Sequence, residues 1–176
     1  FRNLRDVNRF ISSFSFHLGI LKKGTISEVN IVDLIGIEVL RQFEYKVFEQ
    51  IFYSKKMFTA SATTRYGSNL SAESNEKIVM GKILGMASTG KADSVKGIFE
   101  VLFPNVKWAW GANHFSGVGD DEFANLRINH EGRFNTYFSL FLPDGSVSQS
   151  EYSLAIQLSS DEEKFFTLLN GYIEQG

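Results

Sequence analysis

The sequence of 176 residues has no cysteine and only two prolines. The lack of cysteine excludes disulfides, thiol catalysis and cysteine-ligated zinc. No run reaches the roughly 18 apolar residues that a membrane-spanning helix needs, and no secretory signal pattern is visible. The 18 Lys and Arg nearly balance the 20 Asp and Glu, so no net field draws the chain to nucleic acid or anionic lipid. We expect a cytoplasmic chain that neither inserts into a membrane nor binds nucleic acid directly.

The composition that remains is that of a globular domain. Hydrophobic residues make up 43% and charged residues 22%, which is ordinary for a soluble fold with a real core. Apolar residues recur at three- and four-residue steps through residues 4–21, after the cap residue Asn30, and through residues 95–103 before Pro104, which indicates amphipathic helices. The sequence therefore predicts an all-α fold, a compact multi-helix bundle in a single domain spanning residues 1–176.

Stretches without a helical period are predicted to be loops. Residues 54–73 are rich in Ser, Thr, Ala and Gly and read as a loop, after which Ser74 can cap the next helix. Residues 105–128 are Gly-rich and aromatic and predict one long loop, a feature that is often functional. Strand signals are poor, and we expect any short β-pairing in residues 56–62 or 105–110.

Residues 85–92 nearly match a phosphate-binding P-loop, G-x-x-x-x-G-K-[ST]. Ala92 stands where the Mg²⁺-binding hydroxyl belongs, and the segment follows a helical pattern rather than a strand. We therefore interpret it as a turn between two helices in which Gly85 and Gly90 relieve backbone strain. On this interpretation Lys91 has no catalytic role.

The aromatic loop contains the other candidate site. Trp108, Trp110 and His114 are candidates for a loop that binds a protein partner. Aromatic rings beside cations can also stack on bases, but no basic stripe is present. The rings can instead pin the long loop onto the helices. An alternative places His114 with Asp120 and Asp121 in a small metal-dependent hydrolase. The spacing of the three histidines matches no metal motif, so we predict no metal site.

A resemblance to a known family weighs on the first helix. The segment Arg5-Asp6-Val7-Asn8-Arg9-Phe10 resembles the R-D-V-x-R-F segment that begins the helical region after the nucleotide-binding core of KAP-type P-loop NTPases. Further stretches resemble the same family in the same order: residues 28–34, Leu40-Arg41, Phe43-Glu44, Leu102-Phe103-Pro104, Arg127-Ile128 with Phe134, Tyr137 and Phe138, and Leu142-Pro143-Asp144-Gly145. The family's Walker A and Walker B elements do not appear here, and we expect them before Phe1.

The resemblance implies that the chain is a C-terminal helical lid and output module. The upstream P-loop core of the same protein would hold ATP and Mg²⁺, and this segment alone would catalyse nothing. Arg5 is the implied nucleotide sensor and Arg9 the second candidate, because a guanidinium stabilises charge on the γ-phosphoryl oxygens. Arg127 or Arg133 would support packing instead. The resemblance further implies an unknown protein partner, a bacterial setting with a part in phage defence, and membrane association only through upstream segments.

The main alternative to the NTPase module is a stand-alone helical protein-interaction module without nucleotide chemistry. It would bind its partner through residues 105–128. The sequence upstream of Phe1 separates the two hypotheses, because a P-loop after an apolar strand favours the NTPase.

Overall fold

The fold, seen in a computed structural model, is all-α as predicted. The structure describes residues 3–23, 26–59, 70–110, 120–139 and 149–173. Within these ranges the first half contains α1 (Leu4–Ile20), β1 (Lys22–Lys23), β2 (Ile26–Ser27), α2 (Ile31–Phe43), α3 (Tyr45–Tyr53), α4 (Lys55–Thr59) and α6 (Leu70–Gly85). The second half contains α7 (Ala92–Leu102), the 3-10 helix η1 (Pro104–Trp110), α8 (Asp120–Ala124), α9 (Glu131–Phe134), the 3-10 helix η2 (Asn135–Phe138), α10 (Gln149–Leu158) and α11 (Glu162–Ile173).

Two of the helices that the sequence marks most clearly, α1 and α2, begin at asparagine caps. The side chain of Asn3 accepts a hydrogen bond from the Asp6 amide at 3.0 Å and thereby caps α1. Asn30 does the same for α2, accepting from the amides of Val32 at 3.0 Å and Asp33 at 3.3 Å. Each cap satisfies amides that have no partner inside the helix. The cap predicted at Asn30 is confirmed.

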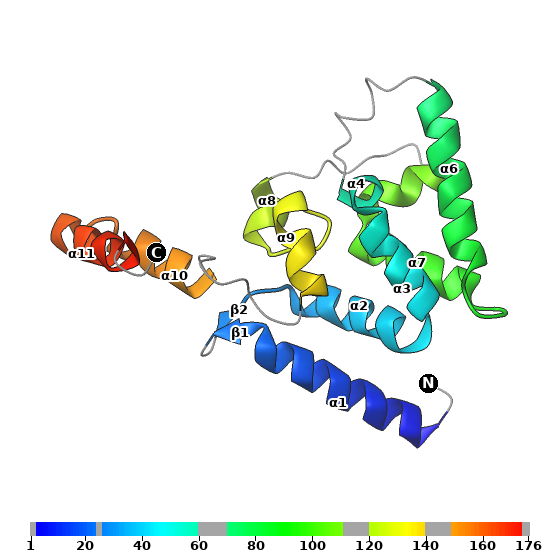
Figure 1. The fold of residues 1–176 in the computed structure, drawn as a ribbon, viewed down its shortest axis with the longest axis horizontal. Coiled ribbons are helices and arrows are strands. Elements are labelled where there is room, and N and C mark those ends of the chain that lie inside the picture. Colours follow the sequence, from blue (N-terminus) through cyan, green and yellow to red (C-terminus); the bar gives the residue numbers. More distant parts are fainter. Residues whose placement is uncertain (1–2, 24–25, 60–69, 111–119, 140–148, 174–176) are drawn as a thin grey trace.

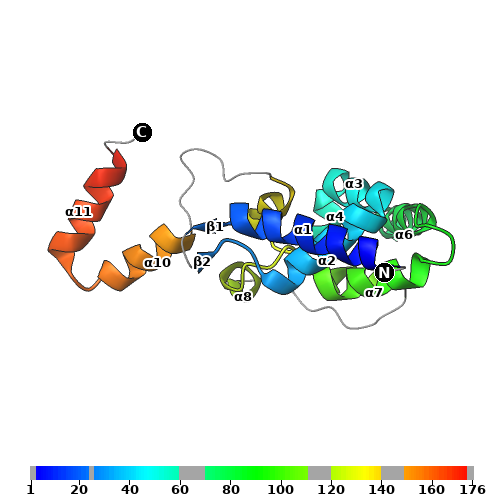
Figure 2. The ribbon, with the colours of Figure 1, turned by 90° about the horizontal axis from the view of Figure 1, so that it is seen from below.

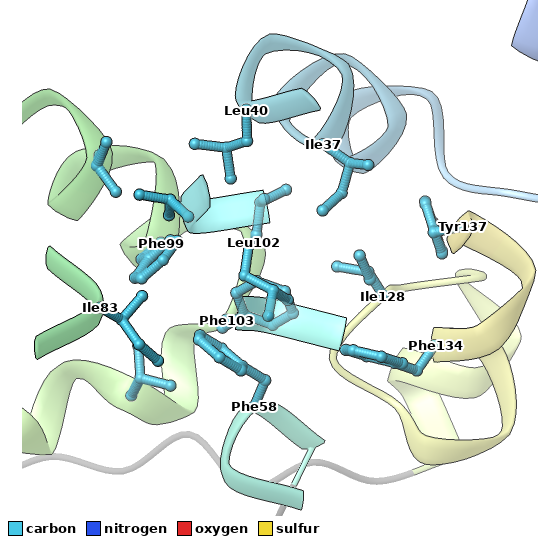
Figure 3. Packing of buried hydrophobic residues seen from close by; sticks show 14 of the residues in the cluster. Ile37, Leu40, Phe58, Ile83, Phe99, Leu102, Phe103, Ile128, Phe134 and Tyr137 are labelled. Carbon is cyan, nitrogen blue, oxygen red and sulfur yellow. The ribbon is translucent and has the colours of Figure 1, made fainter. Parts of the chain in front are cut away.

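Helix α2 lies at the centre of the bundle, with α1 along one side and α7 against another (Figure 1). Gly36 permits the close approach to α7, because a Cβ there would meet Leu102 Cδ2 at 2.8 Å. In the view of Figure 3 the apolar core lies below α2, where rings from α4 and α7 meet aliphatic side chains. Phe58 packs on Phe103 with ring centroids 4.7 Å apart and on Phe99 at 5.3 Å.

Three local predictions were wrong. Residues 56–59 and 105–110 are helical, and the described strand pairing lies instead at Lys22 with Ser27 and Lys23 with Ile26. The predicted loop of residues 54–73 contains α4 and the start of α6, so Ser74 lies inside a helix and does not cap one. The predicted loop of residues 105–128 contains η1 and α8 in its described parts.

Helices α10 and α11 project from the end of the bundle that carries β1 and β2 (Figures 1 and 2). They contact each other, and α10 contacts β2. Several of their large apolar side chains are exposed: Tyr152, Leu154, Ile156 and Phe166. None of the helices in the described ranges combines the length and apolar character that crossing a bilayer requires.

Candidate functional site

The two predicted sensor residues share one exposed face of α1. Arg5 and Arg9 are one helical turn apart and line an open hollow of about 770 Å³, together with Ser12, Phe16 and Gln42 of α2. Within the described part of the chain, no hydrogen bond or ion pair engages the Arg5 side chain. Arg9 donates from Nη2 to Oε1 of Gln42 at 3.3 Å. As far as the described residues go, this face therefore presents two cations to solvent, of which Arg9 is tethered and Arg5 is not.

A second hollow of about 530 Å³ lies between the start of α1, the end of α2 and the turn joining α6 to α7. Arg9 and Lys91 both line it. The turn is the segment that resembles a P-loop, and it connects two helices as interpreted, with Gly90 at φ 73° in the left-handed region. The amide of Ser88 donates to Glu44 Oε2 at 2.7 Å. A carboxylate thus occupies a turn amide that a phosphate would use in a true P-loop.

Beneath the arginine face lies a buried carboxylate, Glu38 of α2, whose side chain is 0% exposed. Ser13 Oγ donates to Glu38 Oε1, and Gln42 Nε2 donates to both Ser13 Oγ at 2.9 Å and Glu38 Oε1 at 3.3 Å. His17 Nδ1 lies 3.1 Å from Glu38 Oε2 and 2.9 Å from the Ser13 carbonyl oxygen. Both neighbours of Nδ1 are acceptors, which places the ring proton on that nitrogen.

Arg41 completes the charge balance of this network. Its Nη1 donates to Glu38 Oε2 at 2.8 Å, its Nη2 donates to the Tyr137 carbonyl at 3.0 Å, and its guanidinium lies over the Phe48 ring at 4.9 Å. Burial lowers the pKa of Arg41, and the attraction of Glu38 opposes that shift. A buried charge is tolerated only when paired and hydrogen-bonded. The network therefore ties α1, α2 and η2 together.

A second buried carboxylate, Asp33, anchors the other end of α2. Asp33 Oδ2 accepts from Arg127 Nε at 2.9 Å and from the Ile128 amide at 2.8 Å, and its side chain is 0% exposed. Burial raises the pKa of Asp33, opposed first by the Ile128 amide and then by the charge and hydrogen bond of Arg127. Arg127 also donates to the Val101 carbonyl at 2.7 Å. This arginine supports packing, as one of the sequence interpretations proposed.

Tyr137 fastens the segment before α2 to the second half of the chain. Its hydroxyl accepts from the Asn30 amide at 2.8 Å and donates to the Leu126 carbonyl. Burial is the main cause that raises the pKa of the Tyr137 hydroxyl far above its ordinary value. The phenol therefore stays neutral and acts as a structural donor and acceptor.

The residues predicted for an interaction loop are brought together only in part. Trp110 ends η1, and the Lys96 ammonium lies 5.1 Å from its ring centroid. Trp108 belongs to the same 3-10 helix, whereas His114 lies outside the described residues. Asp121 is exposed in α8. Within the described ranges no cluster of three metal-ligating side chains occurs.

Gln42, Ser13 and Glu38 were missed by the sequence reasoning. Ser13 and Glu38 are 25 residues apart in the chain, so no local spacing connects them. The available signal was Glu38, a charged residue on a largely apolar helix. A buried charge needs hydrogen-bonding partners, so its presence there predicts polar neighbours.

Comparisons of the chain with protein-family models, with curated proteins and with solved structures found no match.

Proposed function

We propose that this chain is the helical lid and output module of a KAP-type P-loop NTPase, coupling ATP binding in an upstream core to a partner-facing surface. Arg5, and secondarily Arg9, would contact the phosphates of ATP held with Mg²⁺ by that core. The observation that carries the proposal is the pair of arginines on one exposed face of α1, around an open hollow, with Arg5 unengaged by the described residues. The proposal includes a role in bacterial phage defence.

The physical basis is charge stabilisation coupled to helix position. A guanidinium is attracted to the negative charge of the γ-phosphoryl group. Hydrolysis removes that group, and the attraction is lost with it. Helix α1 packs along α2, which carries the buried Glu38 and Asp33 that bind α1 and the α8–η2 region. A displacement of α1 would therefore reach the far side of the bundle through α2.

The test is Arg5→Ala in the complete gene product. We expect ATP turnover to fall about ten- to hundredfold, because a hydrogen bond to a charged group is worth about 1.5–3 kcal/mol. Thermal stability should stay unchanged, since Arg5 is exposed. Lys46→Ala is the matched control, because Lys46 is an exposed cation of α3, away from the hollow. Unchanged turnover in Arg5→Ala would remove Arg5 from the sensor role.

A stand-alone protein-interaction module remains the second candidate function. The exposed apolar side chains of α10 and α11 favour it, because such side chains are typical of contact surfaces. The upstream sequence decides between the two. A G-x-x-x-x-G-K-[ST] segment after an apolar strand, and a later strand ending in Asp, support the NTPase, whereas a gene product that lacks them and does not bind Mg·ATP supports the interaction module.

A further inference from the structure

We infer that Gln42 is a positioning residue for Arg9, holding its guanidinium at the arginine face so that a phosphate group meets a preorganised donor. The inference rests on the proposed function, because it names what orients the second sensor arginine. It depends on three linked observations: the orientation of the Gln42 amide, the remaining donors of Arg9, and the shared hollows.

The orientation of the Gln42 amide is fixed from inside the protein. Ser13 Oγ donates its one hydrogen to Glu38, so toward Gln42 it can only accept, and the group that faces it is Nε2. Glu38 Oε1 lies 3.3 Å from Nε2 on the same side as Ser13 Oγ, so both acceptors attract the same edge of the amide group. These contacts hold Nε2 toward the buried side and leave Oε1 facing outward, where it accepts from Arg9 Nη2 at 3.3 Å.

Holding Arg9 in this way leaves most of its binding capacity intact. A guanidinium has five N–H donors in a rigid fork, and Gln42 engages one of its nitrogens, Nη2. Arg9 and Gln42 both line the hollow beside Arg5 and the one beside Lys91. An anion approaching either hollow meets Arg9 with its rotamer already restricted, which lowers the entropy lost on binding.

The network also gives Arg9 a mechanical connection. From Gln42 the hydrogen bonds continue through Glu38 and Arg41 to the Tyr137 carbonyl. This path crosses from α1 through α2 to η2. A phosphate that displaces Arg9 would therefore also strain hydrogen bonds to buried groups of α2.

The experiment is a double-mutant cycle on Mg·ATP binding by the complete gene product. We expect Gln42→Leu to weaken Mg·ATP binding about three- to tenfold, the worth of one hydrogen bond. In an Arg9→Ala background the same substitution should change binding by less than about twofold, because its effect acts through Arg9. Gln50→Leu is the matched control, since Gln50 lies in α3 outside the network.

Each outcome decides between the two proposals. Equal effects of Gln42→Leu in both backgrounds, or no effect beside a clear loss in Arg9→Ala, would overturn the positioning role while leaving the sensor proposal standing. Unchanged Mg·ATP binding in both Arg5→Ala and Arg9→Ala would overturn both proposals. If Gln42→Leu does not fold, Ser13→Ala replaces it, because it removes the group that orients the Gln42 amide, and the same cycle with Arg9→Ala applies.

Discussion

The bundle around α2 and the projecting pair α10–α11 use the same residue types in opposite ways. Phe99 in α7 is 0% exposed, whereas Phe166 in α11 is 56% exposed. The bundle rings are stacked edge to face on other rings, which adds to the free energy gained by removing apolar area from water. Among the side chains that the structure describes, none in α10 or α11 belongs to the buried core of the bundle. We therefore expect the pair α10–α11 to contribute little to the free energy of unfolding of the bundle.

The charged groups follow the same division. In α2, Glu38 and Asp33 are fully buried and each has an arginine partner. At the start of α11, Asp161, which precedes the helix, pairs with Lys164 at 2.7 Å on the surface, and Lys164 holds the pKa of Asp161 below its usual range. Exposed pairs contribute little because water screens them, whereas removing one partner of a buried pair strands a charge. Both of these buried ion pairs thus have their carboxylate in α2.

The strongest way to test this contrast is a matched pair of truncations. Phe99→Ala should lower the free energy of unfolding by about 3–5 kcal/mol, because it removes a buried ring and leaves a cavity. Phe166→Ala should change it by less than about 0.5 kcal/mol, the ordinary range for a surface substitution. Urea unfolding followed by circular dichroism measures both. A large loss in Phe166→Ala would mean that α11 packs into the cooperative core after all.

The next test adds a methyl group instead of removing a ring. Gly36→Ala should cost about 1–3 kcal/mol, because its Cβ would lie 2.8 Å from Leu102 Cδ2 and overpack the contact between α2 and α7. Gly97→Ala is the control, since Gly97 is exposed in α7 and no atom lies within 4 Å of a Cβ there. That variant should gain about 0.5–1 kcal/mol from the better helix propensity of alanine. Equal signs in the two variants would contradict close packing at Gly36.

The parts of the fold that could be predicted are those whose own sequence contains the signal. The apolar period and the Asn30 cap specify α2 without any reference to distant residues. Helix α4 has no such signal, because its five residues are too few for a period and are held by burial of Met57 and Phe58. Helix η1 depends in the same way on a distant contact, since Asn105 Nδ2 donates to the Phe58 carbonyl at 2.9 Å. Tertiary contacts, not local propensity, specify both.

The candidate site divides along the same line. The placement of Arg5 and Arg9 on one face follows from their spacing of four residues. The link from Arg9 to Gln42 spans 33 residues, and the link from Arg127 to Asp33 spans 94. The position of Asp33 in the first turn of a helix can be deduced from the sequence, whereas its partnership with Arg127 cannot be. Long-range polar pairing becomes visible only when the helices are placed.

The smallest expected effect concerns the pH dependence that Asp33 brings to the bundle. Burial raises its pKa above the ordinary value of 3.8, so the folded protein binds this proton more tightly than the unfolded chain does. The contribution of Asp33 is fully present below its unfolded pKa and is lost as pH rises through the folded pKa. Asp33→Asn removes the titration, so the free energy of unfolding of the unmodified protein, minus that of the variant, should fall as pH rises.

Urea unfolding at several values from about pH 4 to about pH 7 measures this difference, since these values extend upward from the ordinary pKa of an aspartate. Asp121→Asn is the matched control, because Asp121 is an exposed aspartate of α8. A difference that rises with pH would mean that the Ile128 amide and Arg127, which accompany Asp33 Oδ2 at 2.8 and 2.9 Å, outweigh the cost of burial. In that case the charged form of Asp33 would stabilise the fold. Buried Asp33 and exposed Asp161 would then both stabilise the fold when charged, and would differ only in how much.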